Sequence, residues 1–222
     1  MQKDLIIKLK KESTRLPIMR NGEIIGWLRT LGIKALEDDS LVEKLASWRE
    51  KHKQFFLTVF PYDVNRTRKW VENVVLANHD RILFLVEDAD YELLGNYGLC
   101  DIDHETAQID NTLKGEEKGS KGIFSQVERT ILHFAFNDLK VKHVYCQVFS
   151  NNKRAIEHHL NNGMSYISSR KLKKNIISET EYTYIPIADD EESNVDFLYN
   201  KYAISSNDFY KVKEQPLDNK YL

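Results

Sequence analysis

The segment from Thr106 to Met164 constrains the fold more than any other part of the chain. It begins with a strand-like run (106–113) and a loop rich in glycine and lysine (114–122). A long amphipathic pattern (123–139), a second strand-like run (143–149) and a short polar helix (152–162) follow. Apolar residues at helical spacing support the long helix, and Gly163 closes the short one. This order predicts an α+β protein with α/β/α layers.

The composition indicates one domain of ordinary size and excludes several classes of protein. The chain has 222 residues, of which 41% are hydrophobic, and a net charge of −2, so it has no general attraction for nucleic acid or an anionic membrane. No apolar run approaches the ~20 residues of a membrane helix, and the charged N-terminus is unlike a signal peptide. Cys100 and Cys146 lie in apolar runs, which suits buried free thiols in a reducing compartment better than a disulfide. We therefore expect a cytoplasmic protein that binds neither nucleic acid nor membranes, and leave a homodimer open.

Before Thr106 the sequence predicts a hairpin, two helices and several strands. Asn21-Gly22 lies between two apolar runs, and both residues accept positive φ, so this pair predicts a hairpin turn. Ser40 and Glu43 form a capping box for a helix that extends to about His52, and Asp63 caps a second helix. Extended stretches are expected at residues 30–36, 55–60, 81–86 and 92–100, and residues 5–9 alternate apolar residues with lysine.

After Met164 the pattern predicts a closing hairpin and a tail. Residues 164–170 and 181–187 alternate and are expected to pair with each other, with residues 171–175 as a charged turn. From Ala188 the chain becomes acidic and then aromatic, with Phe197, Tyr199, Tyr202, Phe209, Tyr210 and Tyr221. The expected domain therefore covers residues 1–187, including an N-terminal hairpin extension. Residues 188–222 form the tail, and a truncation after Ala188 should leave a folded core.

The loop at residues 114–122 has the features of an anion site. Gly119 and Gly122 let the backbone approach a phosphate, three lysines add charge, and the following helix presents its first amides. A P-loop is excluded because Ser120 stands at its second glycine, and a dinucleotide fingerprint is excluded because Glu117 stands at its middle glycine. Glycine spacing alone favours a flexible charged turn. In the helix that follows, Glu128, Arg129 and Lys140 are expected to face solvent.

Ser120 to Phe124, the long helix, the strand at residues 144–149 and Asn152-Lys-Arg-Ala together resemble the GNAT acyltransferase superfamily. The resemblance covers about residues 24–187 and is densest from Thr106 to Met164. It implies the GNAT fold, a mostly antiparallel mixed sheet that splays between the fourth and fifth core strands and is flanked by about four helices. It also implies an acetyl-CoA-dependent N-acetyltransferase.

The resemblance implies which residues bind coenzyme A. The family's Gln/Arg-x-x-Gly-x-Gly/Ala motif, whose amides hold the pyrophosphate, matches Gly119, Ser120, Lys121, Gly122, Ile123 and Phe124. Gly122 is kept, whereas Gly119 and Phe124 depart from the pattern. The family's Asn-x-x-Ala, which contacts the pantetheine arm, matches Asn152 and Ala155. The strand whose amide holds the thioester carbonyl matches residues 108–113, and we assign Asn111, Thr112 and Leu113 to the cofactor.

The resemblance also implies candidate catalytic residues. Many family members have a tyrosine four residues after the alanine that protonates the departing thiolate, and here this position is His159. A histidine titrating near ~6.5 can protonate a thiolate of ~8.5 at neutral pH, although His158-His159 also reads as a solvated helix face. The attacking amine must lose a proton. By position we prefer Asp110 as its acceptor over Asp101, Asp103 and His104.

The acceptor is expected to bind near residues 56–70. This stretch resembles bacterial family members that acetylate amino groups on nucleotide-linked sugars, and also the ribosomal-protein N-terminal acetyltransferases. We assign Tyr62, Arg66 and Trp70 to the substrate because aromatic rings stack on bases or sugars and arginine pairs with diphosphate, although Trp70 also fits the core. The main hypothesis is direct attack by a small amine, a nucleotide-linked amino sugar, in a ternary complex without a metal. The alternatives are a protein N-terminus as acceptor and a non-catalytic acyl-CoA-binding or interaction module.

Overall fold

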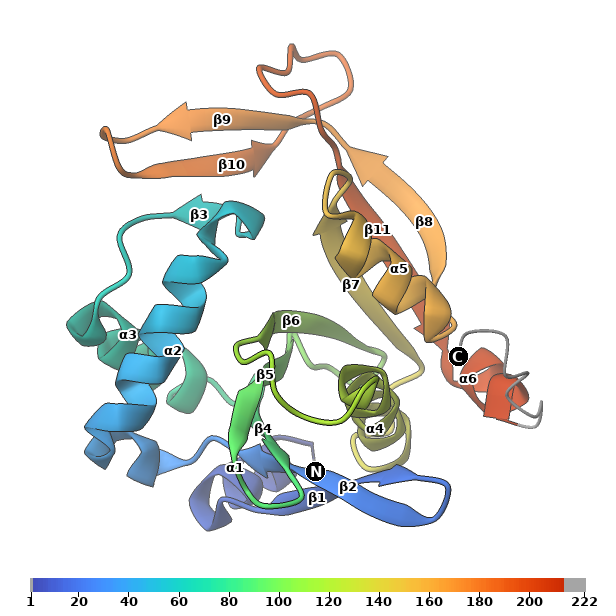
Figure 1. Ribbon diagram of the computed structural model, residues 1–222. Coiled ribbons are helices and arrows are strands. Elements are labelled where there is room, and N and C mark those ends of the chain that lie inside the picture. Colours follow the sequence, from blue (N-terminus) through green and yellow to red (C-terminus); the bar gives the residue numbers. More distant parts are fainter. Residues whose placement is uncertain (1, 214–222) are drawn as a thin grey trace.

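A computed structural model describes residues 2–213, which build an eight-stranded sheet with helices packed on it (Figure 1). The sheet order is β1-β2-β4-β5-β6-β7-β11-β8. Its strands are β1 (Arg15–Arg20), β2 (Glu23–Thr30), β4 (Ile82–Asp88), β5 (Leu93–Cys100), β6 (Thr106–Lys114), β7 (His143–Phe149), β8 (Ser165–Arg170) and β11 (Tyr199–Ser205). Since β6 and β7 run parallel and the other neighbours antiparallel, the expected mixed α+β fold is confirmed.

A second, smaller sheet and the helices complete the described chain. The small sheet consists of β3 (Thr58–Val59), β10 (Tyr182–Pro186) and β9 (Leu172–Ile176). The helices are α1 (Gln2–Glu12), α2 (Asp39–Lys51), α3 (Val64–Trp70), α4 (Ile123–Asn137), α5 (Lys153–Asn161) and α6 (Ser206–Lys213). A π-helix (Val71–Leu76) continues α3, and 3₁₀ helices precede and follow α2 (Ile33–Glu37 and Lys53–Phe55). None of the helices within residues 2–213 has both the length and the apolar character that crossing a membrane requires.

Strand β4 shows that both faces of the sheet are covered by hydrophobic cores. Its first six residues are all buried, because alternate side chains enter different cores. Phe84 packs edge-on against Phe134 of α4, with ring centroids 5.5 Å apart. Leu83 and Leu85 instead join the core beneath α2 and the π-helix. The sheet therefore lies between α4 on one face and α2 with α3 on the other.

The sheet opens between β6 and β7. These strands pair only from Thr106 to Ile109, opposite His143 to Cys146. Beyond this point β6 continues to Lys114 along β5, and β7 continues to Phe149 along β11. The splay between the fourth and fifth core strands is thus confirmed, and it places the free ends of both strands at one site.

The C-terminal part differs from the expectation. Strand β8 pairs with β11, and not with residues 181–187. The charged turn was expected at residues 171–175, but Leu172–Ile176 form β9 and pair with β10. Strand β11 lies inside the sheet with Tyr202 and Ile204 buried, so this part of the expected tail belongs to the domain. Strand pairing over such distances is set by packing, which local alternation does not reveal. Tyr221 lies outside the described residues.

The N-terminal part also differs in detail. Residues 2–12 form a helix whose Ile6 and Leu9 are buried, and Lys10 Nζ donates to the carbonyls of Val75 and Asn78 (2.5 and 2.6 Å). The expected hairpin at Asn21-Gly22 is present. The stretch at residues 30–36 is extended only to Thr30, and that at 55–60 only at Thr58 and Val59.

The two expected helix caps have different outcomes. Asp38, and not Ser40, caps α2, by accepting from the Leu41 amide at 3.0 Å. Asp63 caps α3 as expected, by accepting from the Arg66 amide at 2.8 Å. Asp38 accepts from the amide three residues on, as Ser40 would have done from Glu43, and this moves the N-cap of α2 two residues toward the N-terminus.

Candidate active site

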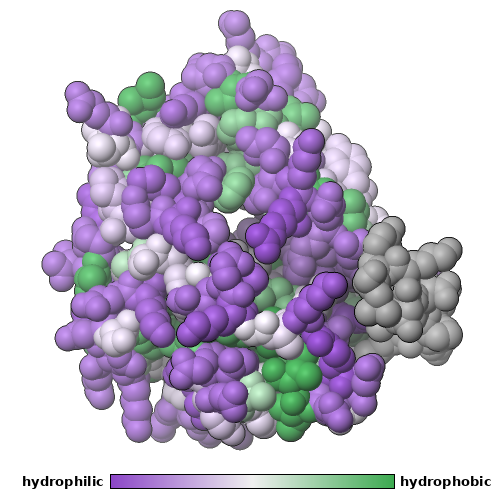
Figure 2. Space-filling model, in the orientation of Figure 1, coloured by the Kyte–Doolittle hydropathy of each residue, from purple (hydrophilic) through white to green (hydrophobic). Residues whose placement is uncertain are grey.

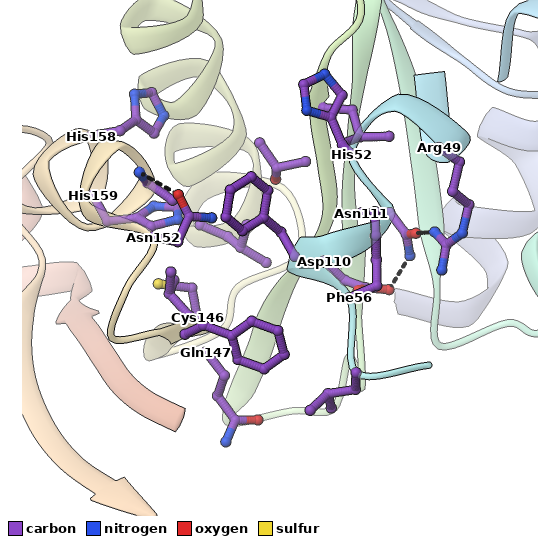
Figure 3. Close-up of a pocket in the computed structure, with 18 of the residues that line it drawn as sticks. Arg49, His52, Phe56, Asp110, Asn111, Cys146, Gln147, Asn152, His158 and His159 are labelled. Atoms are coloured by element: carbon purple, nitrogen blue, oxygen red, sulfur yellow. Dashed lines mark hydrogen bonds between the residues drawn. The ribbon is translucent and has the colours of Figure 1, made fainter. Parts of the chain in front are cut away.

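The splay between β6 and β7 opens a cleft of about 750 Å³. In the space-filling view the molecule is hollowed near its centre, and hydrophilic residues surround the opening (Figure 2). We call one side the α5 wall; it consists of Cys146, Val148, Asn152, Ala155 and His159. We call the other side the α2 wall; it consists of Arg49, His52, Phe56, Leu57 and Trp70. Residues 108–114 of β6 form the floor, and Figure 3 shows the two walls facing each other across it.

The floor is irregular where the two walls meet it. Asn111 has a φ of 48°, a left-handed conformation that asparagine tolerates better than most residues. Gly98 pairs with Asp110 and Asn96 with Leu113, so within the described sheet Asn111 and Thr112 have no partner residue on β5. The buried Thr112 Oγ1 also lacks a hydrogen-bond partner among residues 2–213. Polar groups released from a ladder in this way can bind a ligand carbonyl.

Helix α4 begins differently from the helices near it. Asp38, Asp63 and Asn152 cap α2, α3 and α5 with their side chains. No side chain of the described chain caps α4, which starts after Gly122 at a φ of 75°. The first amides of a helix lack intrahelical partners, so this end can receive an anion such as a pyrophosphate.

The loop before α4 lies at the edge of the cleft. Gly119, Ser120, Lys121 and Gly122 are exposed and Ile123 is buried, and these five residues lie outside the cleft lining. Phe124 does line the cleft. Arg20 of β1 donates from Nη2 to the Lys121 carbonyl at 2.7 Å, which places a cation beside the loop. Sequence analysis missed Arg20, since only the packing of the hairpin beside α4 brings it there.

Asn152 and Ala155 lie together on the α5 wall, as the sequence predicts. The Ala155 amide donates to Asn152 Oδ1 at 3.3 Å, so the Asn-x-x-Ala spacing is also a helix cap. With Oδ1 occupied by the cap, the Asn152 amide nitrogen is the group available for a ligand. Both residues line the cleft.

Glu128 was expected to face solvent, and this expectation is wrong: its side chain is fully buried between α4 and α5. It accepts from Tyr97 Oη at 2.9 Å and lies 3.0 Å from His159 Nδ1 through either carboxylate oxygen. His158 Nε2 lies 2.5 Å from Glu128 Oε2, so His158 is half-buried and not on a solvated face. Helix α5 packs over the edge of the apolar stripe of α4, and this contact buries Glu128.

The electrostatics of this group depend on the two histidines. Burial raises the pKa of Glu128, but the attraction of His159 and the hydrogen bonds from His158 and His159 outweigh it and hold the pKa at about 2. Burial and then the Glu128 charge raise the pKa of Tyr97 and of Cys146 well above their usual ranges. At neutral pH the site therefore contains a carboxylate, a neutral phenol and a neutral thiol around His159.

Asp110 lies on the floor, where the sequence analysis expected a base. Arg81 Nη1 and Asn111 Nδ2 both donate to Asp110 Oδ2, and Asp110 lines the cleft. Asp101, Asp103 and His104 are exposed and lie outside the cleft lining. Of the four candidate bases, the structure thus brings only Asp110 to the described cleft.

Of the three expected substrate residues, Trp70 alone lines the described cleft. Tyr62 donates from Oη to the Thr58 carbonyl at 3.1 Å, and Arg66 pairs with Glu181 at 2.8 Å on the surface. Arg49, which the sequence analysis missed, takes the central position on the α2 wall. Its guanidinium lies 3.9 Å from the Phe56 ring centroid and donates to Asn111 Oδ1. Arg49 looks like any polar position of an amphipathic helix, so the sequence contains no signal for it.

Comparisons with known proteins agree with this geometry. A model of the acetyltransferase (GNAT) domain family matches residues 28–165. The solved structure of apo FdhC, a nucleotide-linked sugar GNAT, is similar over 90% of this chain and 96% of that one, with a TM-score of 0.63 at 14% identity. Spermidine N-acetyltransferase from Vibrio cholerae, in complex with CoA and spermine, has a TM-score of 0.60 at 17% identity, over 82% and 96% of the two chains. A search of curated proteins found no significant match.

The residues present fit the cofactor that this family uses. The bulge at Asn111 and Thr112 offers released polar groups at the point where the strands part, and the uncapped start of α4 offers amides to an anion. Acetyl-CoA is the cofactor of these acyltransferases. The family match covers more than half of the chain, and the fold and cleft agree with it, so this chain belongs to the GNAT acetyltransferase family and is an acyltransferase enzyme.

Proposed function

We propose that this enzyme acetylates the primary amine of a nucleotide-linked amino sugar, by direct attack in a ternary complex. The observation that carries the proposal is Arg49. Its guanidinium lies among the rings of Phe56, Tyr62 and Trp70, at 3.9, 4.8 and 5.4 Å from their centroids. No carboxylate within residues 2–213 forms an ion pair with it. A cation held by rings, facing a cleft and free of a counter-ion suits a phosphate and a stacked base or sugar.

The other charges of the cleft favour the same class of acceptor. Two carboxylates line it, and each already has a cation: Asp110 pairs with Arg81, and Glu117 with Lys114. A polyamine such as spermidine would find no unpaired carboxylate among these lining residues. An acceptor with a diphosphate would find Arg49, which supports the likeness to the nucleotide-linked sugar enzyme over the likeness to the spermidine enzyme.

The roles of the residues follow from their positions. Bound acetyl-CoA supplies an activated acetyl group as a thioester. The amides at Asn111–Leu113 would hold the carbonyl oxygen. The loop at residues 119–124 would hold the pyrophosphate with Arg20 and through those of its amides that remain free, since the Ile123 amide already donates to the Ser120 carbonyl at 3.1 Å. Asn152 and Ala155 position the pantetheine arm.

Two side chains handle protons in this proposal. Asp110 accepts the proton of the amine at Oδ1, because both recorded donors occupy Oδ2. His159 donates a proton from Nε2 to the sulfur, because Nδ1 is bound to Glu128. A thiol gives up its proton at a pKa of ~8.5, so the acid needs only modest strength.

The test is a thiol-release assay with acetyl-CoA and three amines: a nucleoside-diphosphate amino sugar, spermidine and a peptide with a free N-terminus. We expect kcat/KM to be highest for the sugar nucleotide. Arg49→Gln should raise its KM about tenfold or more, since a hydrogen bond to a charged group contributes about 1.5–3 kcal/mol. The matched control is Arg66→Gln, which lies outside the cleft and should change KM less than about twofold. Faster turnover of spermidine or the peptide would reject the sugar nucleotide, and CoA binding without turnover of any amine would favour a binding module.

A further inference from the structure

We propose that Glu128 is a positioning residue that holds His159 as the acid of the reaction; this inference rests on the proposed role of His159. The two residues come from α4 and α5, and the contact joins a fully buried carboxylate to a ring that lines the cleft.

The geometry determines which ring nitrogen faces the cleft. An ionised carboxylate only accepts hydrogen bonds, so the 3.0 Å contact requires a proton on His159 Nδ1. Tyr97, itself fully buried, donates to Glu128 at 2.9 Å and fixes the carboxylate from the side of β5. With Nδ1 held in this way, Nε2 is the nitrogen left for the cleft, and the ring cannot turn without losing its contact with the buried carboxylate.

One negative charge faces the ring. The titratable groups around His159 are Glu128 from α4, Tyr97 from β5, Cys146 from β7 and His158 from α5 itself. Tyr97 and Cys146 have pKa values well above their usual ranges, so both are neutral at pH 7. Glu128 is thus the one negative charge in this set. The proposed acid role requires a ring that carries a proton on both nitrogens, and Glu128 is the counter-charge in contact with it.

Glu128, His158 and His159 could instead be the ligands of a metal ion, but the distances between their ligand atoms are too short for this. The three ligand atoms lie within 4.8 Å of one another. The Nδ1–O and Nε2–O distances are 3.0 and 2.5 Å. Ligand atoms at about 2.0–2.1 Å from a tetrahedral metal would lie farther apart than this. The His159 contact has the length of a hydrogen bond, and the His158 contact is that of an ion pair.

The proton balance of the step is complete. As the new C–N bond forms and the C–S bond breaks, the Nε2 proton passes to the sulfur and its electron pair stays on the ring. The amine loses one proton to Asp110, and water returns a proton to His159 after release of the thiol. Glu128 keeps its charge throughout and moves no proton itself.

The experiment compares Glu128→Gln with His158→Gln and His159→Gln in the full chain. In E128Q and H159Q, kcat should fall about 10- to 100-fold, as for other outer partners of a functional histidine, while KM for acetyl-CoA changes less than about threefold. The kcat–pH profile of E128Q should differ from that of the wild type, because the variant lacks the buried charge that contacts the ring. His158→Gln should change kcat less than about threefold, because His158 touches the same carboxylate without providing the acid.

Nitrogen NMR of the imidazoles, in protein free of acetyl-CoA, gives a readout besides activity. The His159 signal, identified by its loss in H159Q, should show a protonated Nδ1 in the wild type and lose that signature in E128Q. An unprotonated Nδ1 in the wild type overturns the proposal even if E128Q does not fold. So do an E128Q profile equal to the wild type, an H158Q defect as large as that of E128Q, and activity that chelators abolish and zinc restores. If the wild type turns over no amine, the proposed function fails, whereas the NMR signal still tests the contact.

Discussion

The α5 wall and the α2 wall are built in different ways. The α5 wall comes from one continuous stretch, residues 143–164, and its His159 is buried and bonded to the buried Glu128 of α4. The α2 wall comes from residues 49–70 and is partly exposed. Within this stretch, β3 pairs with β10 (Figure 1). Under the proposed function, the acid that protonates the thiolate therefore lies in the buried core. The groups proposed to select the amine lie on peripheral segments, which can vary without disturbing the chemistry.

The largest expected effect comes from removing the strand behind the α5 wall. A truncation after Ala188 deletes β11, which pairs with both β7 and β8, and it removes the buried side chains of Tyr202, Ile204 and Phe209. Burial of each such side chain contributes about 1.5–3 kcal/mol, and a domain has about 5–15 kcal/mol in total. We expect the truncated chain to be insoluble or unfolded by circular dichroism. If the truncated chain is soluble and unfolds in a cooperative thermal transition, residues 188–222 are not needed for the folding of the domain.

The next largest effect should distinguish the two walls by their contributions to CoA binding and amine binding. Leu172 and Pro186 are ladder partners, so an Asn-Gly turn in place of residues 173–185 can close the hairpin there. This change removes most of β9 and β10, including Tyr182, which pairs with Val59, and Glu181, which pairs with Arg66. We expect CoA affinity within about threefold of wild type and a KM for the amine raised about tenfold or more, since side-chain and loop ordering costs about 0.5–1.5 kcal/mol per group. Equal losses of both affinities would show that the walls are not independent.

The comparison also shows what the sequence could predict. The Asp63 cap was predicted correctly, because a cap depends on a few neighbouring residues. The cofactor roles of Asn152, Ala155 and Gly122 rest on equally local motifs and stay predictions. The fold class followed from the order of elements between residues 106 and 164. These signals are local, and local chemistry determines them.

The failures concern contacts between distant elements. Glu128 is next to Val127, which is buried, and the sequence does not tell how far the apolar stripe of α4 extends under α5. Arg49 acquires its role only when Asn111 and Phe56 meet it in space. Strand β11 has neighbours more than 25 residues away along the chain, and such pairing is determined by long-range packing.

A smaller effect tests the coenzyme side of the cleft. Gly122 has a φ of 75° at the start of α4, and Gly22 has a φ of 85° in the β1–β2 turn. Valine at either position should cost about 1–2 kcal/mol of stability, because both require the left-handed region. Only Gly122→Val should also weaken CoA binding, by about tenfold or 1.4 kcal/mol, since its side chain would lie where the pyrophosphate approaches. Isothermal titration calorimetry with CoA measures this affinity. Equal CoA affinities of the two variants would reject the hypothesis that the pyrophosphate binds at the start of α4.

The smallest effect is a pH dependence that belongs to the α5 wall alone. The pKa of Glu128 is lowered from 4.5 to about 2 in the folded chain, so the unfolded chain takes up this proton first as the pH falls. The stability that Glu128 contributes is therefore present above pH 5 and is lost progressively as the pH falls toward 2, by on the order of 1–2 kcal/mol at pH 3. Urea unfolding at pH 5, 4 and 3 should show a steeper loss for the wild type than for Glu128→Gln.

The control for this dependence is a carboxylate that lies in water. Glu105 is paired with Lys142 on the surface, where solvent screens the interaction, so Glu105→Gln should keep the steep acid slope of the wild type. If E128Q and the wild type lose stability in parallel, Glu128 is not held by the two histidines as a charged group. The buried α5 wall would then differ from the exposed α2 wall in packing alone and not in its electrostatics.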